Sequence, residues 1–159
     1  MSAEPDDRPL PRRIEDADPR RFVSIGGPVS EFRLSLRLFG DDLDPDEISG
    51  LLGSTPTDSY RKGDILPGRY RRTAKQGAWF LTADHREGTD KGISSVVNEL
   101  IDSLNGDLTV WASLSRRYDV DFFCGVFMRH SGNEGFELAL ETMKRLLDRG
   151  VKIGFDIYY

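Results

Sequence analysis

The chain has 159 residues, of which 38% are hydrophobic, and it carries a formal net charge of −5 at pH 7. This length fits one domain with a tail, and the composition supplies a packed core, which excludes a wholly disordered chain. The single cysteine excludes an internal disulfide framework, and no apolar stretch approaches the roughly 20 residues of a membrane span, so we expect a soluble cytoplasmic protein without membrane contacts.

The first residues have the composition of a disordered tail. Residues 1–21 contain four of the eight prolines, six acids and five arginines, and they offer few apolar side chains. Such a segment cannot bury enough surface to offset the entropy that it loses on ordering. We therefore predict a disordered or loosely attached tail over residues 1–28 and a single folded domain over residues 29–159.

The folded part begins with an alternating segment. Apolar residues stand at every second position from Phe32 to Leu38, and Arg33 and Arg37 are among the residues between them. A period of two predicts a strand with one buried face, and Gly40 is expected to end it.

A short helix with strong start signals is expected next. Asp44 is a favourable N-cap residue, Pro45 suits the first helical position, and Glu47 stands where a capping box places its acid. Gly53 is a natural residue for the helix end. The alternate acids from Asp42 onward have the spacing that begins a calcium-binding EF-hand loop, but Glu47 and Gly53 stand where that loop needs its glycine and its final glutamate. We therefore assign the acids to the helix start and predict no metal site.

Residues 54–76 form a polar, basic segment punctuated by glycine and proline, and we predict a long loop without regular structure. Residues 61–75 hold six basic side chains and one acid, so this segment carries +5 and the rest of the chain −10. Loops of this length are unusual in compact domains and tend to be functional or mobile. The candidate binding residues of this basic loop are Arg61, Lys62, Asp64, Arg69, Arg71 and Arg72.

Several uses of the basic loop remain open. Its cations can pair with the domain's own acids, such as Asp41 and Asp42, or they can contact an acidic partner or ligand. The spacing of a phosphate-binding Walker loop is absent, as is an aromatic RNA-recognition signature. The acidic total charge also argues against nucleic acid, which we regard as an unlikely partner.

The remaining elements complete an alternating succession. We predict a strand over residues 78–82, a helix over 93–104, a strand over 119–128, a helix defined by Phe136, Leu140, Met143 and Leu147, and a strand over 151–159. Residues 108–114 fit either a short helix or a packed connector. The succession predicts an α+β, two-layer sandwich, with a four-stranded, mostly antiparallel or mixed sheet and three amphipathic helices on one face, as a ferredoxin-like variant.

Five sequence blocks in register resemble a known family. They are Phe39-Gly40-Asp41-Asp42-Leu43-Asp44-Pro45, Leu52-Gly53 with Pro56-Thr57, Lys62-Gly63-Asp64, Trp79, and Phe155-Asp156-Ile157-Tyr158. Together they resemble the bacterial family called Domain of Unknown Function 4279 over residues 32–159. The resemblance implies a small standalone bacterial domain, no attributed reaction and no catalytic residues. A loose association of its members with toxin systems implies an immunity-type role.

The strand periodicity also predicts an open face of the sheet. Alternation places Arg33, Arg37 and Phe39 on the side away from the helices, together with Asp156 and Tyr158 of the last strand and Phe123 and Phe127 of the third. The candidate residues of this sheet face or pocket are Arg33, Arg37, Trp79, Asp156 and Tyr158. Arginine and aromatic side chains are enriched at interfaces, so the face is a candidate homodimer or partner interface. A ligand site near Trp79 and a plain solvated face of Arg–Asp pairs are the alternatives, and Trp79 alone is more typical of a core residue.

The sequence contains no recognisable catalytic set. Cys124 stands in an apolar run, and His85 and His130 lack the spacing of zinc ligands. We therefore expect an inert thiol, no cofactor and a non-enzymatic binding domain of the immunity or regulatory type, which uses the basic loop and the open sheet face. A small-molecule sensor or an unrecognised enzyme is the alternative, and nucleic-acid binding is a weaker one.

Overall fold

The structure is a computed structural model that describes residues 27–29, 31–85, 91–128 and 134–158. Residues 1–26 of the predicted tail, His130 and the side chain of His85 lie outside the described residues. Two residues assigned to the tail form the short strand β1 (Gly27–Pro28), which pairs in parallel with β8 (Glu134–Gly135).

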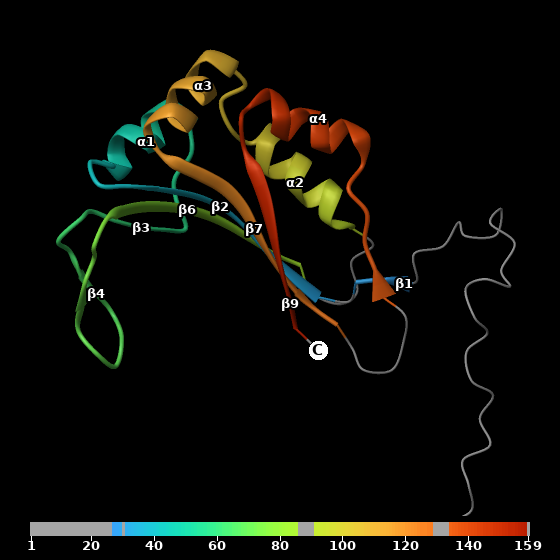
Figure 1. Cartoon of the computed structure of the whole chain (residues 1–159), viewed down its shortest axis with the longest axis horizontal. Coiled ribbons are helices and arrows are strands. Elements are labelled where there is room, and N and C mark those ends of the chain that lie inside the picture. The colour runs from blue at the N-terminus through green and yellow to red at the C-terminus, as the bar shows by residue number, and fades with distance from the viewer. Residues whose placement is uncertain (1–26, 30, 86–90, 129–133, 159) are drawn as a thin grey trace, which may run out of the picture.

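Five strands of the described chain form one layer of the domain (Figure 1). They are β2 (Glu31–Gly40), β3 (Asp58–Tyr60), β6 (Gly77–His85), β7 (Asp119–Phe127) and β9 (Lys152–Tyr158), and their order in space is β3-β6-β2-β7-β9. Neighbouring strands are antiparallel except β7 and β9, which run parallel. The sheet is therefore mixed, and its central strand, β2, is the first of the five in the sequence.

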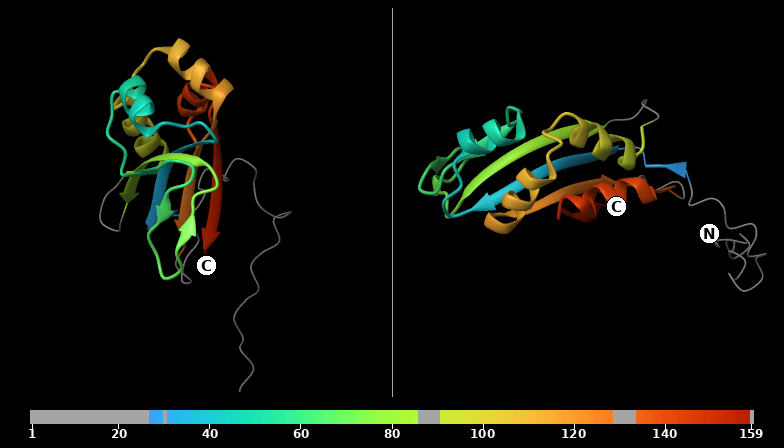
Figure 2. Two further views of the ribbon diagram at one scale, coloured as in Figure 1. Left: turned by 90° about the vertical axis from the view of Figure 1, so that its left-hand side faces the viewer. Right: turned by 90° about the horizontal axis from the view of Figure 1, so that it is seen from above.

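Four helices among the described residues cover one face of this sheet and leave the other face open (Figures 1 and 2). They are α1 (Pro45–Leu52), α2 (Ile93–Asp102), α3 (Leu108–Arg117) and α4 (Leu140–Asp148). None of these helices has the length and apolar character needed to cross a membrane. The α+β class is confirmed; among the described residues, the main sheet has one strand more than the sequence predicts, and its helix layer has one helix more.

The order of elements extends a simpler plan. Along the chain, β2, α1, β3, β6, α2 and β7 follow one another in a β-α-β-β-α-β succession. The helices α3 and α4 and the strand β9 are additions to it. Because α4 carries the chain back across the sheet between β7 and β9, those two strands run parallel.

The alternation of β2 explains where the core lies. Phe32, Leu34, Leu36 and Leu38 are each exposed by 1% or less, and they point toward the helices. Burial of a large apolar side chain contributes about 1.5–3 kcal/mol to folding, so this strand anchors the core. The opposite face of the same strand carries its arginines, which sets the position of the site described below.

The acids before α1 serve the helix start, as the sequence predicts. The Asp44 side chain accepts a hydrogen bond from Asp46 N–H at 3.0 Å, and Gly53 ends the helix with a φ of 69°. That hydrogen bond, together with Arg61, lowers the pKa of Asp44 from its ordinary value. The capping box differs from the prediction, because the Glu47 carboxylate binds Arg117 of α3 at 2.6 Å.

Residues 108–114, for which the sequence allows a short helix or a packed connector, belong to the helix α3. Asp107 caps α3 by accepting a hydrogen bond from Thr109 N–H at 2.8 Å, and Trp111 and Leu114 are fully buried. The indole of Trp111 donates to the carbonyl of Asn105 at 2.7 Å. A capped start and a buried face therefore make this segment a helix rather than a connector.

The predicted loop over residues 54–76 contains regular structure, and the prediction of an unstructured loop is wrong. The strand β3 lies within it, and β4 (Ile65–Leu66) pairs with β5 (Arg72–Thr73) in a hairpin that projects from the sheet on the side away from the helices (Figure 1). These strands are short and mostly exposed, so they lack the apolar alternation that marks a half-buried strand.

The face of α4 that packs on the domain is not the apolar face that the sequence predicts. Thr142 and Leu146 are the buried residues of this helix, whereas Leu140 and Leu147 are exposed by 83% and 78%. Phe136 precedes the helix and packs on Phe155 of β9, with ring centroids 4.8 Å apart. The helix therefore presents most of its apolar stripe to solvent.

Candidate functional site

Three rows of side chains cross the middle strands on the open face. From β6 through β2 to β7 the rows are Phe80-Arg37-Asp121, Thr82-Ser35-Phe123 and Asp84-Arg33-Gly125. The pairing register alone brings these residues together, because alternate positions of each strand point to the same side. The rows combine cations, carboxylates, hydroxyls and aromatic rings on one surface.

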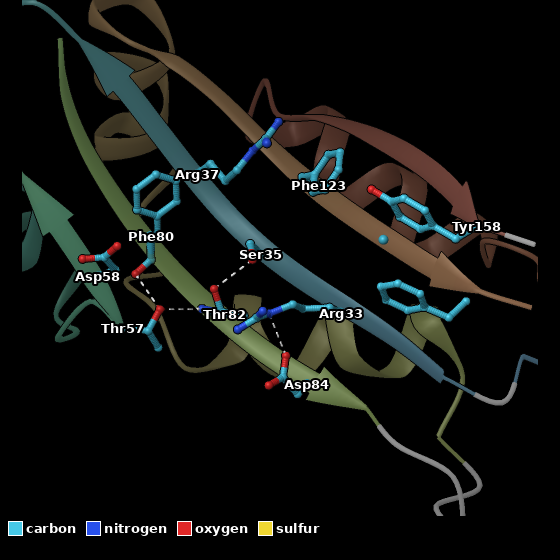
Figure 3. Close-up of a pocket in the computed structure, with 12 residues that line it drawn as sticks. Arg33, Ser35, Arg37, Thr57, Asp58, Phe80, Thr82, Asp84, Phe123 and Tyr158 are labelled. Carbon is cyan, nitrogen blue, oxygen red and sulfur yellow. Dashed lines mark hydrogen bonds and ion pairs between the residues drawn. The ribbon is translucent and has the colours of Figure 1, made fainter. Parts of the chain in front are cut away.

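A groove of about 580 Å³ follows these rows (Figure 3). Arg33, Ser35, Arg37, Phe80, Thr82, Asp84 and Phe123 line its middle, Thr57 and Asp58 line one side, and Phe127 and Tyr158 the other. No helix of the described chain lies on this face, so the groove opens to solvent along its length. Of the predicted sheet-face residues, Arg33, Arg37 and Tyr158 line this groove.

Arg37 is the most firmly held cation of the groove. Its Nε and Nη2 donate to the two carboxylate oxygens of Asp121 at 2.8 and 2.7 Å. The guanidinium lies 4.3 Å from the ring centroid of Phe123 and 5.5 Å from that of Phe39. The hydrogen bonds from Arg37 to Asp121 raise the pKa of Arg37, so the group remains charged. A fixed cation beside two aromatic rings suits carboxylate, phosphate or aromatic groups of a partner.

The floor and one end of the groove carry polar side chains that bind one another. The hydroxyls of Ser35 and Thr82 are 2.8 Å apart and share a hydrogen bond. Beyond them, Arg33 Nε lies 2.9 Å from a carboxylate oxygen of Asp84, and both side chains are largely exposed. Such an exposed pair contributes little to stability, so its groups can exchange partners at little cost.

The β9 side of the groove is aromatic. Phe127 and Tyr158 stack with ring centroids 5.0 Å apart, and both are exposed. The Tyr158 hydroxyl donates to the Asp156 carboxylate at 2.7 Å, and this bond raises the pKa of Tyr158. The predicted residue Asp156 is the register partner of Gly125, which lines the groove, but Asp156 itself does not line it.

The opposite side is built by the edge strand β3. Thr57 N–H and Oγ1 both donate to the carbonyl of Phe80, and Thr57 Oγ1 accepts from Thr82 N–H at 3.1 Å. These bonds fix the start of β3 against β6. They also place the carboxylate of Asp58 at the groove without any ion pair among the described residues.

A second hollow of about 530 Å³ lies between β3 and the hairpin. Asp58 lines both hollows, and Arg72, Leu66 and Tyr60 line the second one. The groove and the hairpin therefore form one continuous surface, with β3 between them. Figure 1 shows the hairpin descending beside the open face.

The basic loop divides into a paired part and a free part. Arg61 binds Asp44 at 2.7 Å and Asp46 at 2.6 Å, and Lys62 lies 3.0 Å from Asp41. The carboxylate of Asp64 accepts from Arg61 N–H at 2.8 Å. These contacts link the hairpin base to the start of α1, and their ion pairs are as exposed as that of Arg33 and Asp84.

The hairpin tip carries the free cations of the loop. Within the described residues, no ion pair involves Arg69, Arg71 or Arg72. Tyr70, between the first two, is exposed by 76%. The tip therefore presents three guanidinium groups without ion pairs to described residues, beside an exposed phenol.

Trp79 does not belong to the site, in contrast to its place among the predicted pocket residues. It is fully buried on the helix-covered face opposite Leu38, and its indole N–H donates to Ser49 Oγ of α1 at 3.0 Å. Its neighbour Phe80 points into the groove instead. Residues 78–81 are all apolar, so the sequence of this segment gives no alternation that would identify Phe80 as a site residue, and only the register of β6 against β2 places Phe80 and Thr82 in the groove.

The groups capable of metal or thiol chemistry are inert or dispersed. In the ranges that the structure covers, no group of three or more His, Cys, Asp or Glu side chains converges on a common point. Cys124 is fully buried in β7, and burial raises the pKa of its thiol to about 12. The groove itself combines arginines, aspartates, aromatic rings and hydroxyls.

Comparison with known proteins adds a family to this geometry. A family model described as a domain of unknown function (DUF4279) matches residues 30–159. The chain belongs to the DUF4279 family. The resemblance seen in the sequence blocks is thereby confirmed, and the match spans the sheet, the groove and the hairpin of the DUF4279 domain. No curated protein and no solved structure matches the chain.

Proposed function

We propose that this DUF4279 domain, an extended ferredoxin-like variant, is a non-enzymatic cytoplasmic binding domain. It holds a segment of a polypeptide partner in the open groove and an acidic region of the same partner at the hairpin tip. A role of the immunity or regulatory type follows from such binding. The observation that carries the proposal is the placement of Arg37, which Asp121 fixes between aromatic rings in an uncovered groove.

Charge favours different parts of the partner at the two ends of the surface. The groove lining contains two arginines and two aspartates, so it is neutral overall and suits a segment with both polar and aromatic side chains. The hairpin tip has the three free arginines, which favour acidic groups. Aromatic residues and arginine are also the side chains that most often dominate binding energy at protein interfaces.

The shape of the groove favours a polypeptide over a small molecule. Its volume of about 580 Å³ lies in the range of ligand pockets. However, such pockets bury most of a ligand's surface, whereas this groove has the sheet as its floor and no element of the described chain above it. An extended segment needs only one such surface. A small anionic ligand that spans Arg33 and Arg37 is the second candidate.

A displayed peptide library selected against the full chain tests the proposal. We expect the selected peptides to be enriched in acidic and aromatic residues. Their dissociation constants should rise at least tenfold for Arg37→Gln and for Phe123→Ala. Lys144→Ala on α4, on the opposite side of the sheet, is the matched control and should leave affinity unchanged. Binders that tolerate both groove variants would contradict the proposal.

A thermal-shift panel of small carboxylates and phosphates separates the two candidates. A rise in melting temperature that Arg37→Gln abolishes would favour the small anionic ligand. A flat panel, together with groove-dependent peptides, would favour the polypeptide partner.

A further inference from the structure

An uncovered apolar flank lies beside the edge of the sheet. β9 is the last strand on that side within the described residues, and α4 packs above it in the helix layer (Figures 1 and 2). Leu140, Met143 and Leu147 form a stripe on α4, exposed by 83%, 43% and 78%. An apolar stripe of this kind on a solvent-facing helix is typical of an interaction surface.

The stripe points away from the rest of the helix layer. Asn98 of α2 donates to Thr142 Oγ1 at 3.0 Å and accepts from Arg145 Nη1 at 3.1 Å, so these two residues face α2. Successive helical residues are turned by about 100°, which places Leu140 and Leu147 on the opposite side of the axis. The stripe therefore lies on the same flank as the outer edge of β9.

That outer edge carries free backbone groups. The carbonyl of Tyr158 accepts from Met128 N–H at 2.9 Å, which shows that Tyr158 directs its backbone groups toward β7. Neighbouring strand residues direct theirs to opposite sides, so Ile153, Phe155 and Ile157 direct theirs outward. None of the described residues pairs with them. An unpaired edge of this kind is a template for another strand.

The sequence of β9 suits pairing with a copy of itself. An antiparallel copy related by a two-fold axis at Gly154 places Lys152 opposite Asp156 of the other chain, so opposite charges meet twice. In the same register Ile153 lies opposite Phe155 of the other chain, and apolar side chains meet on the helix-covered face. The strand is thus complementary to itself in both charge and apolar character.

We propose that β9 and α4 form the interface of a two-fold symmetric homodimer. The two β9 strands pair antiparallel and join the sheets of both chains, while the α4 stripes pack against each other above them. A shared two-fold interface of this type uses one patch on both subunits, which matches the self-complementary strand. The axis is perpendicular to the sheet, so both open faces lie on the same side of the dimer. Two grooves then face a common partner surface, which raises binding through effective concentration.

Charge reversal at the edge provides the decisive test. Lys152→Glu places two carboxylates opposite each other in the dimer, and Asp156→Lys places two ammonium groups opposite each other. By analytical ultracentrifugation of the full chain, we expect the wild type to have twice the monomer mass of 18.0 kDa at ~50 µM. Each variant alone should show a dissociation constant at least tenfold higher. An equimolar mixture of the two variants should recover the dimer, because every contact is again between opposite charges.

The helix stripe has its own variant and control. Leu140→Lys combined with Leu147→Lys should also yield a monomer, whereas Leu108→Lys on α3, a similar change at an exposed leucine away from the flank, should leave the dimer intact. Recovery on mixing rules out misfolding as the reason for the charge variants' behaviour. A wild-type monomer at all concentrations would overturn the proposal and leave the flank to a different protein. Dimers that persist in the single charge variants would overturn it as well.

Discussion

Arg37 and Asp121 are joined by two parallel hydrogen bonds of 2.8 and 2.7 Å, although they are 84 positions apart in the sequence. The pair spans β2 and β7, and both side chains are mostly buried, with 27% and 13% of their surfaces exposed. Bidentate geometry gives such pairs directional strength. The pair therefore both stabilises the sheet and orients the guanidinium in the groove.

Asp121→Asn should weaken both of these roles. The variant loses charge-assisted hydrogen bonds, so we expect the free energy of unfolding to fall by about 1.5–3 kcal/mol in urea denaturation. Affinity for groove-selected peptides should fall as well, because Arg37 loses its fixed orientation. Asp119→Asn is the matched control, since its partner Lys152 and its own side chain are largely exposed. Equal losses in both variants would contradict this assignment.

Ser49→Ala should destabilise the domain without affecting the groove. The change removes the only described acceptor of the buried Trp79 indole N–H, and an unpaired buried donor costs about 1–3 kcal/mol. Ser95→Ala, at an exposed position of α2, should have almost no effect on the melting temperature. If the Ser49→Ala variant lost peptide affinity at a temperature where the variant is still folded, Trp79 would have to contribute to the binding site.

Substitution of two glycines by alanine should change the free energy of unfolding in opposite directions. A Cβ atom at Gly77 would lie 2.7 Å from the carbonyl oxygen of Leu43 and 3.2 Å from that of Gly40, so Gly77→Ala should cost about 1–3 kcal/mol. A Cβ atom at Gly50 in α1 meets nothing within 4 Å. Gly50→Ala should therefore stabilise by about 0.5–1 kcal/mol through helix propensity. Thermal unfolding of both variants measures these changes in stability. A Gly77→Ala protein as stable as the wild type would contradict the prediction.

The thiol of Cys124 should make stability depend on alkaline pH. Burial raises its pKa from 9.0 to about 12, so the folded state favours the neutral thiol. The resulting stability is complete below pH 9 and is lost as the pH rises from 9 toward 12. The stability of the wild type should therefore fall more steeply over this range than that of Cys124→Ala. Modification by a thiol reagent at pH 8 should follow the rate of unfolding, and immediate labelling would contradict the buried position.

The charge of Asp44 should make stability depend on acidic pH in the opposite sense. The Asp46 N–H, together with Arg61, lowers the pKa of Asp44 below 3.8. Its contribution is therefore present above that value and disappears as the pH falls through the lower, folded pKa. Asp44→Asn keeps a capping side chain but loses the charge. The melting temperatures of wild type and variant should differ at pH 7 and converge near pH 2, and a constant difference would argue against the charge effect.

Features with local causes could be predicted from the sequence. The start and end of α1 follow from Asp44, Pro45 and Gly53, whose preferences act within a few residues. The two faces of β2 follow from its alternation, which places Arg33 and Arg37 on the open side. In these elements, burial and local geometry both agree with the sequence pattern.

Features that depend on neighbours could not be predicted in the same way. β3 is short and exposed, so only its backbone pairing with β6 identifies it as a strand. For α4, the pattern of Leu140, Met143 and Leu147 gives an apolar stripe but does not say whether another element of the chain covers it. The pairing of Arg61 with Asp44 and Asp46 likewise depends on the return path of the loop, which the sequence does not specify.

The central position of β2 has a consequence for how the protein is made. It leaves the ribosome before both of its partners, and its pairing with β7 joins residues more than 80 positions apart, such as Arg37 and Asp121. Such non-local pairing slows folding relative to a chain with mostly local contacts. Until β6 and β7 have been synthesised, the apolar face of β2 has no sheet to join. The nascent chain therefore exposes the apolar side chains of this core strand until its partners emerge, which makes the strand an expected contact for chaperones during synthesis.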